Sequence, residues 1–220
     1  PPAVTGGDGL DPGALAGRYQ LPDGTEIVAA AAPGALIITG ANQRAIDLLC
    51  YPALADPDTH VVLNERVETL ANAVLRREWE GLRTVLSDSE ARFPRIKAFM
   101  EALLSGSVDP AGSTPEVHVV GTFPSAYRSG LVETVVEIGG GEAPASFRFI
   151  WENNLIVGLG VADGRRSVRV PFVPDESGRL IGYHLAVAKV IVADITYDGT
   201  GAVSGLEFAQ SSGRVLAVRR

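Results

Sequence analysis

The sequence predicts an α+β protein in which short N-terminal antiparallel hairpins are followed by two helices and then by a curved, cone-like antiparallel sheet. Three observations favour this class. Proline-glycine turns separate short apolar runs before residue 50, and apolar residues recur three and four apart between 67 and 104. From residue 116 onward, apolar and polar residues alternate between frequent turn dipeptides. A β-sandwich with an inserted helical hairpin is the competing architecture.

The N-terminal part of the chain predicts a linker over 1–16 and a small β-hairpin module over 17–58. The linker is expected because its residues are mostly Pro, Gly, Ala and Asp, with little to bury. Proline presets φ and glycine takes positive φ at the Pro22-Asp23-Gly24 and Pro33-Gly34 turns. Strands are therefore expected at 17–21, 25–31, 35–39 and 43–49.

Two amphipathic helices are expected in the middle of the chain. Apolar residues across 67–86 repeat at helical spacing, with Glu and Arg on the other face, so one long helix should bury that stripe. Ser87 or Ser89 can cap a second helix, which Gly106 would end. Pro94 is expected to delay its start.

The remainder of the chain predicts an antiparallel meander that completes one α+β domain over 59–220. The Asn153-Asn154 pair suits a tight hairpin, because asparagine tolerates the left-handed backbone region. Strands are expected at 116–120, 132–138, 146–152, 155–161, 167–173, 180–184, 187–197, 202–208 and 214–218.

Composition narrows the classes of partner and cofactor. The formal net charge of the 220 residues is −7, which argues against nucleic acid as a partner. No apolar run reaches 18 residues, so no membrane span is expected. Cys50 is the only cysteine, which rules out an intramolecular disulfide and a cysteine-built metal site. We expect no metal and no cofactor.

The N-terminal residue and the choice of basic residues favour an exported protein from a bacterium. The chain begins at Pro1 rather than Met, which predicts that an upstream signal peptide or domain has been removed. Lys97 and Lys189 are the only lysines beside many arginines, as in proteins from GC-rich bacteria. An extracytoplasmic location is therefore expected.

The candidates for catalysis are few, and no hydrolase, metal or nucleotide motif is written in the chain. The three histidines, His60, His118 and His184, stand alone in sequence. His118 and Asp194 are candidate general acid/base residues, because Asp194 interrupts the apolar run 190–195.

The alternative is that these residues have structural rather than functional roles. Asp194 can equally be a surface carboxylate beside an arginine such as Arg148 or Arg169. Phe147, Phe149 and Trp151 share one strand face and are candidate ligand-binding residues, or they form the contact between sheet and helix.

Two segments resemble known families. Segment 17–24 (GRYQLPDG), followed by 35–38 (ALII) and 43–45 (QRA), resembles hairpins found after the catalytic domain of β-lactamase-related serine hydrolases. The element order of 62–220 is similar to the nuclear-transport-factor-2-like (cone) fold. The first resemblance implies an accessory region whose catalytic domain lies upstream. The serine nucleophile pattern S-x-x-K of that family is absent, since Pro94 and Ala186 stand three positions before the lysines.

Two functions of different classes follow. The first is a non-catalytic accessory or ligand-binding module of an exported bacterial hydrolase, with an apolar or peptide-like ligand. The second is a small cone-fold enzyme, an isomerase or hydrolase-like protein, whose acid/base residue lies in an apolar cavity. By analogy with cone folds, an open sheet face would also allow a homodimer.

Overall fold

The computed structural model of the chain describes residues 11–52, 58–107, 115–125, 128, 130–139, 145–162, 167–184 and 190–220. It contains two compact units, one made of 1–57 together with 167–220 and the other of 58–166. The first unit is discontinuous in sequence, unlike the expected division into 17–58 and 59–220. Residues 1–10 of the expected linker and residues 187–189 of the expected strand 187–197 lie outside the described residues.

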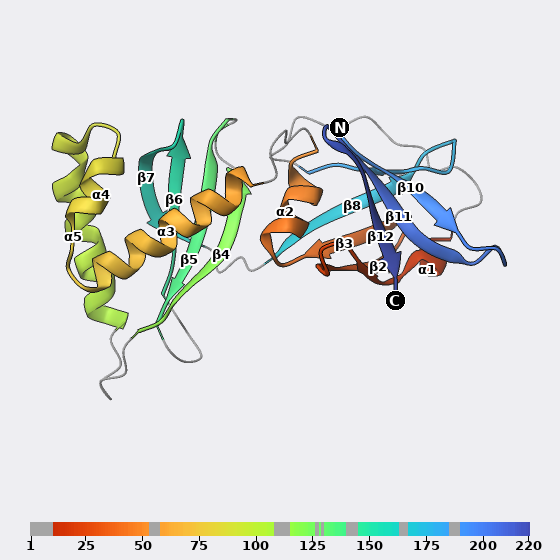
Figure 1. The fold of residues 1–220 in the computed structure, drawn as a ribbon, viewed down its shortest axis with the longest axis horizontal. Helices are drawn as coiled ribbons and strands as arrows, with labels where there is room; N and C mark the ends of the chain where they lie inside the picture. Colours follow the sequence, from red (N-terminus) through yellow and green to blue (C-terminus); the bar gives the residue numbers. More distant parts are fainter. Residues whose placement is uncertain are drawn as a thin grey trace. The chain divides into compact units, whose positions relative to one another are not determined.

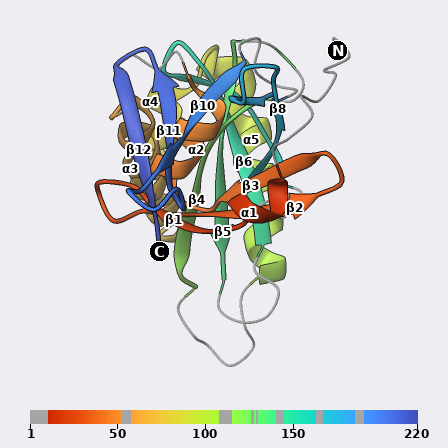
Figure 2. The same cartoon turned by 90° about the vertical axis from the view of Figure 1, so that its right-hand side faces the viewer.

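The first unit is a closed antiparallel barrel of eight strands (Figure 1). Around the barrel the order is β1-β12-β11-β10-β9-β8-β3-β2, and β2 pairs again with β1. Figure 2 shows β10, β11 and β12 side by side, as their register requires. The strands are β1 Gly17–Gln20, β2 Glu26–Ala32, β3 Ala35–Gly40, β8 Val168–Pro174, β9 Leu180–Gly182, β10 Ile191–Tyr197, β11 Val203–Gln210 and β12 Gly213–Arg219.

Side chains fill the interior of this barrel. Strand residues alternate between inside and outside, and the inward ones are apolar. The rings of Phe172 and Phe208 are fully buried and meet edge to face, with centroids 6.0 Å apart. Ile27, Ile38 and Leu206 are also fully buried. The barrel is therefore built around a packed core, and a ligand has to bind outside it.

Two short helices, α1 (Pro12–Leu15) and α2 (Gln43–Cys50), lie at opposite ends of the barrel. Helix α1 precedes β1, and the hydroxyl of buried Tyr19 donates a hydrogen bond to the carbonyl of Leu15 at 2.6 Å. Helix α2 directly follows β3 and packs closely on it. A Cβ atom at Gly40 would lie only 2.4 Å from the Cβ of Ala45, so the approach of helix and strand requires glycine there.

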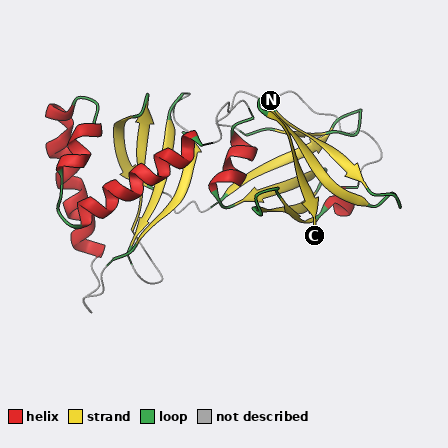
Figure 3. Ribbon diagram, viewed as in Figure 1, coloured by secondary structure: helices red, strands yellow, loops and turns green. Residues whose placement is uncertain are grey.

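In its described residues, the second unit contains helices α3, α4 and α5 and a four-stranded antiparallel sheet in the order β4-β5-β6-β7 (Figure 3). Helix α3 crosses one face of the sheet and contacts β4 and β5. The elements are α3 Thr59–Leu75, α4 Glu80–Val85, α5 Ser89–Ser107, β4 Val117–Pro124, β5 Val132–Ile138, β6 Ala145–Glu152 and β7 Leu155–Val161.

The core between helices and sheet combines apolar packing with a short chain of buried hydrogen bonds. The indole Nε1 of Trp151 donates to Thr134 Oγ1 at 3.0 Å, and the hydroxyls of Thr134 and Thr122 are 2.8 Å apart. Thr122 Oγ1 also donates to Asn64 Oδ1 at 2.8 Å. These bonds connect β6, β5, β4 and α3, so the buried polar atoms also hold the helix on the sheet.

The predicted cone-like sheet and the alternative β-sandwich are both wrong. The strands after residue 116 do not form one curved sheet, because β8–β12 close the barrel together with β1–β3. The sandwich fails because each barrel strand has a hydrogen-bonded neighbour on both sides. Alternation of apolar and polar residues identifies a strand but carries no information about its partner. Here Gly40 pairs with Val168, although the entire sequence of the second unit lies between them in the chain.

Two predicted elements are also wrong in type or extent. Segment 43–49, predicted as a strand, is helix α2, and the side chain of Asn42 caps it by accepting from the N–H of Ala45 at 3.0 Å. The single helix predicted over 67–86 is divided into α3 and α4. Between them Arg77 has a φ of +61°, which ends the first helix. Pro94 lies inside α5 rather than before it.

The predictions based on turn residues are confirmed. Gly24 and Gly34 have φ values of +88° and +69° in the first two hairpins. Asn153 and Asn154, with φ of +50° and +63°, form the hairpin between β6 and β7. Two successive positive φ values are the signature of a type I′ turn, which matches the right-handed twist of the strands.

Candidate functional site

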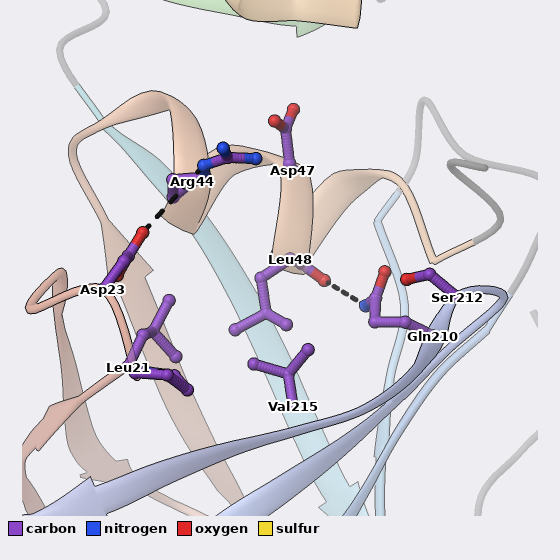
Figure 4. A pocket seen from close by; sticks show the side chains of 9 residues that line it. Leu21, Asp23, Arg44, Asp47, Leu48, Gln210, Ser212 and Val215 are labelled. Atoms are coloured by element: carbon purple, nitrogen blue, oxygen red, sulfur yellow. Dashed lines mark hydrogen bonds and ion pairs between the residues drawn. The ribbon is translucent and has the colours of Figure 1, made fainter. Parts of the chain in front are cut away.

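A pocket of about 300 Å³ lies at the end of the barrel where α2 sits (Figure 4). It is bounded by α2, by the turn between β1 and β2, and by the hairpin between β11 and β12, all within the barrel unit. Its apolar wall consists of Leu21, Pro22, Leu48 and Val215. Its polar wall consists of Asp23, Arg44, Asp47, Gln210 and Ser212.

Helix α2 contributes three residues to the lining of the pocket. Arg44 precedes Asp47 and Leu48 by three and four positions, and Figure 4 shows the carboxylate of Asp47 on the side of the helix away from Leu48. Asp47 is only 6% exposed, and its Oδ1 accepts a hydrogen bond from Gln43 Nε2 at 2.7 Å. Helix α2 therefore adds a buried carboxylate to a partly apolar lining.

The β11–β12 hairpin is fixed to the same helix. Gln210 Nε2 donates to the carbonyl of Leu48 at 3.1 Å, which satisfies one of the carbonyls at the end of α2. The N–H of Ser211 donates to the carbonyl of Pro52 at 2.9 Å. These two bonds hold the hairpin against the segment that follows the helix, so the pocket walls are joined to each other.

The charges of the lining leave the pocket negative. Arg44 Nε lies 3.9 Å from Asp23 Oδ2, and both side chains are partly exposed to solvent. One guanidinium therefore faces the two carboxylates of Asp23 and Asp47. A cationic ligand with an apolar part complements this lining, because two of its three charged residues are carboxylates and Leu21, Leu48 and Val215 are apolar.

The polar lining of the pocket consists of two carboxylates, a guanidinium, an amide and a hydroxyl. Ser212 is its only hydroxyl-bearing side chain, and no histidine, lysine or cysteine is among the lining residues. A serine needs an adjacent base to become a nucleophile. Within the described part of the chain, no group of three or more His, Cys, Asp or Glu side chains could hold a metal ion.

Comparisons with protein-family models, with curated proteins and with solved structures return no match. The site is therefore interpreted from its geometry. Among the described residues, none of the helices combines the length and apolarity needed to cross a lipid bilayer.

The two acid/base candidates belong to different units. Asp194 lies on the outer surface of β10, where Arg214 Nη1 donates to its Oδ2 at 2.6 Å and to Glu207 Oε2 at 2.5 Å. Asp194 and Glu207 are directly opposite each other on neighbouring strands, so Arg214 offsets their repulsion. His118 is exposed on β4 of the other unit. Neither residue lines the pocket.

The remaining candidates are also placed by the structure. Phe147, Phe149 and Trp151 are at most 1% exposed and belong to the core under the helices of the second unit. His60 is buried on α3, and His184 follows β9 in the barrel. His60 and His118 therefore belong to the second unit and His184 to the barrel unit.

Sequence reasoning missed Arg44 and Asp47 because it assigned 43–49 to a strand. On a strand, Arg44 and Asp47 would point to opposite faces. The available signal was Asn42, a favoured N-cap residue, followed by a segment in which Asp47 interrupts apolar neighbours. Read as a helix, that segment brings both charges to one face.

Proposed function

We propose that this chain is a non-catalytic ligand-binding module of an exported bacterial hydrolase, and that it binds a small peptide-like ligand at the end of the barrel. The observation that carries the proposal is a pocket whose lining combines apolar residues with two carboxylates, one of which, Asp47, is buried. The large buried side chains inside the barrel, such as Phe172 and Phe208, support binding at this end rather than in its interior.

The ligand class follows from the lining. A peptide-like molecule with a free amino group and an apolar first side chain presents a cation to Asp47 and carbon atoms to Leu48 and Val215. Its carbonyl oxygen can accept from Arg44 or Ser212. The volume of about 300 Å³ is at the small end of ligand sites, so one or two residues of such a ligand fit.

The association with a hydrolase rests on the resemblance of segment 17–24 to hairpins that follow β-lactamase-related catalytic domains. That segment forms β1 and the turn whose Leu21, Pro22 and Asp23 line the pocket. A pocket of this kind, attached to a peptide-cleaving domain, would hold part of the substrate or product. Sequencing the parent gene upstream of Pro1 tests this part, and the absence of a hydrolase domain there would refute it.

Titration with leucinamide tests ligand binding. In ¹H–¹⁵N spectra we expect saturable shifts for residues 44–48 and 210–215 at millimolar concentration, because a small contact area supports only weak affinity. N-acetyl-leucinamide, which lacks the cation, serves as the ligand control and should cause no such shifts.

Two matched variants complete the test. Asp47→Asn removes the buried charge and should abolish the response to leucinamide, whereas Asp194→Asn removes a surface charge and should leave it unchanged. Equal responses to both ligands, or an unaltered response in folded Asp47→Asn protein, would exclude an ammonium site at Asp47.

A further inference from the structure

The outer edge of β7 in the second unit carries unpaired backbone groups. In the part of the chain that the structure describes, the sheet ends at β7, and no strand pairs with its far side. The N–H of Ala162 donates to the carbonyl of Ser146 at 2.9 Å, which shows which residues face β6. Because alternate residues of an antiparallel strand face opposite edges, the N–H and C=O groups of Leu159 and Val161 point outward.

The first half of this edge is already occupied. A bulge places Val157 between the registers of Ile150 and Trp151, and the carbonyl of Val157 accepts a hydrogen bond from the guanidinium of Arg92. The carbonyl of Ile156 accepts from the N–H of Ser87 at 3.0 Å. The open part of the edge therefore begins after the bulge, at Leu159.

The second half of the β7 edge lacks the charged residues and proline that normally protect an edge strand. Natural edge strands carry lysines, other charges or proline, which block pairing with another chain. Strand β7 reads LIVGLGV and has none of these residues. Val161, at the end of the open part, is 58% exposed. The edge is therefore available to a further strand.

A groove of about 680 Å³ runs between this edge and α5. Ile96 and Phe99 of α5 and Leu159 of β7 supply apolar lining. The charged lining residues are Asp88, Arg92 and Arg95, which leave one net positive charge on a chain whose total is −7. Arg95 is exposed and has no hydrogen bond or ion pair among the described residues. The groove therefore favours an acidic occupant.

We propose that this groove is a docking site for an extended acidic peptide segment of a partner protein. The segment adds a fifth strand to the sheet by pairing with Leu159 and Val161, and its carboxylates lie beside Arg95. A single extended chain fits a groove that a helix borders on one side. A second copy of this chain is the less suitable occupant, because it would bring the arginines of two α5 helices together.

Fluorescence anisotropy with a labelled peptide tests the site. The probe is fluorescein-Glu-Val-Glu-Val-Glu-amide, and the control peptide has lysine in place of each glutamate. We expect saturable binding of the acidic peptide that weakens as salt is added, and affinity for the basic peptide lower by about tenfold. Binding should also slow amide exchange at Leu159 and Val161 in the unmodified chain.

Variants separate the backbone contribution from the charge contribution. Val161→Pro removes an outward N–H without removing a bond to β6, and should weaken binding about tenfold. Val161→Thr retains that N–H and should bind like the original. Arg95→Glu should abolish the preference for the acidic peptide, whereas Arg220→Glu, an equal charge change on exposed barrel surface, should preserve it.

Two results would overturn the proposal. One is unchanged amide exchange at Leu159 and Val161 under saturating peptide, which would place binding elsewhere. The other is a concentration-dependent dimer in sedimentation that Val161→Pro converts to monomer, which would make a second copy the occupant of this edge.

Discussion

Two aspartates of the barrel hold their turns by the same hydrogen bonds. Asp175 Oδ1, between β8 and β9, accepts from the hydroxyl and the N–H of Ser177 at 2.8 and 2.9 Å. Asp198 Oδ1, between β10 and β11, accepts from the hydroxyl and the N–H of Thr200 at 2.6 and 2.8 Å. Each carboxylate replaces the backbone as the acceptor of a tight turn.

These bonds predict a response to acid. The hydroxyl of Ser177, together with Arg179, lowers the pKa of Asp175 to about 2, and the hydroxyl of Thr200 lowers the pKa of Asp198. A lowered folded-state pKa adds stability above the unfolded pKa of about 3.9 and loses it as the pH falls toward the folded value. Unfolding followed between pH 5 and about pH 2 should therefore show less acid sensitivity in Asp175→Asn than in the original chain.

A control variant tests whether the hydroxyl of Ser177 lowers the pKa of Asp175. Ser177→Ala removes only the hydroxyl, so the carboxyl titration of Asp175, measured by ¹³C shifts, should move to higher pH. A midpoint that stays near 2 in Ser177→Ala would show that Arg179 and the backbone N–H groups lower the pKa without the hydroxyl.

At the scale of elements, the stability of α2 depends on its N-cap residue, Asn42. Asn42 has extended backbone and caps the helix through the N–H of Ala45, while its Nδ2 donates to Thr25 Oγ1 at 3.3 Å. Asn42→Ala should lower the free energy of unfolding by about 1 kcal/mol, as measured in urea. Asn42→Asp keeps the cap acceptor and should lose less. Equal losses in both variants would show that the bond to Thr25 is the important one.

The elements also show what the sequence can and cannot predict. Turns at Gly24, Gly34 and Asn153-Asn154 were predictable because their signal is local backbone conformation. Helix α2 was not predicted, because a short apolar run fits the periodicity of a helix and of a strand equally well. Only the N-cap residue Asn42 distinguishes the two. Strand partners were out of reach, because pairing Gly40 with Val168 depends on contacts distant in sequence.

The candidate site shares this limit. Leu21, Asp47 and Gln210 approach one another only because the barrel closes and the β11–β12 hairpin is tied to α2. No motif records that closure, whereas Asp194 attracted attention through its local sequence and proves to be paired with Arg214.

At the scale of the whole molecule, the barrel has its own core and should fold without the second unit. Its neighbouring strands β3 and β8 pair directly although residues 58–166 separate them in sequence. Replacement of 58–166 by a flexible Gly/Ser linker of about ten residues should therefore give a folded β protein. Dispersed amide spectra and one cooperative thermal transition are expected. A collapsed, poorly dispersed spectrum would show that the barrel needs the second unit.

The discontinuous barrel also sets the order of events during synthesis. Strands β1–β3 leave the ribosome first, but their partners β8 and β12 are made only after residues 58–166. The second unit, whose contacts are continuous in sequence, is complete before the barrel can close. The nascent β1–β3 segment therefore waits with two open edges, and slow translation of the insertion prolongs the period in which it is exposed to misfolding and to chaperones.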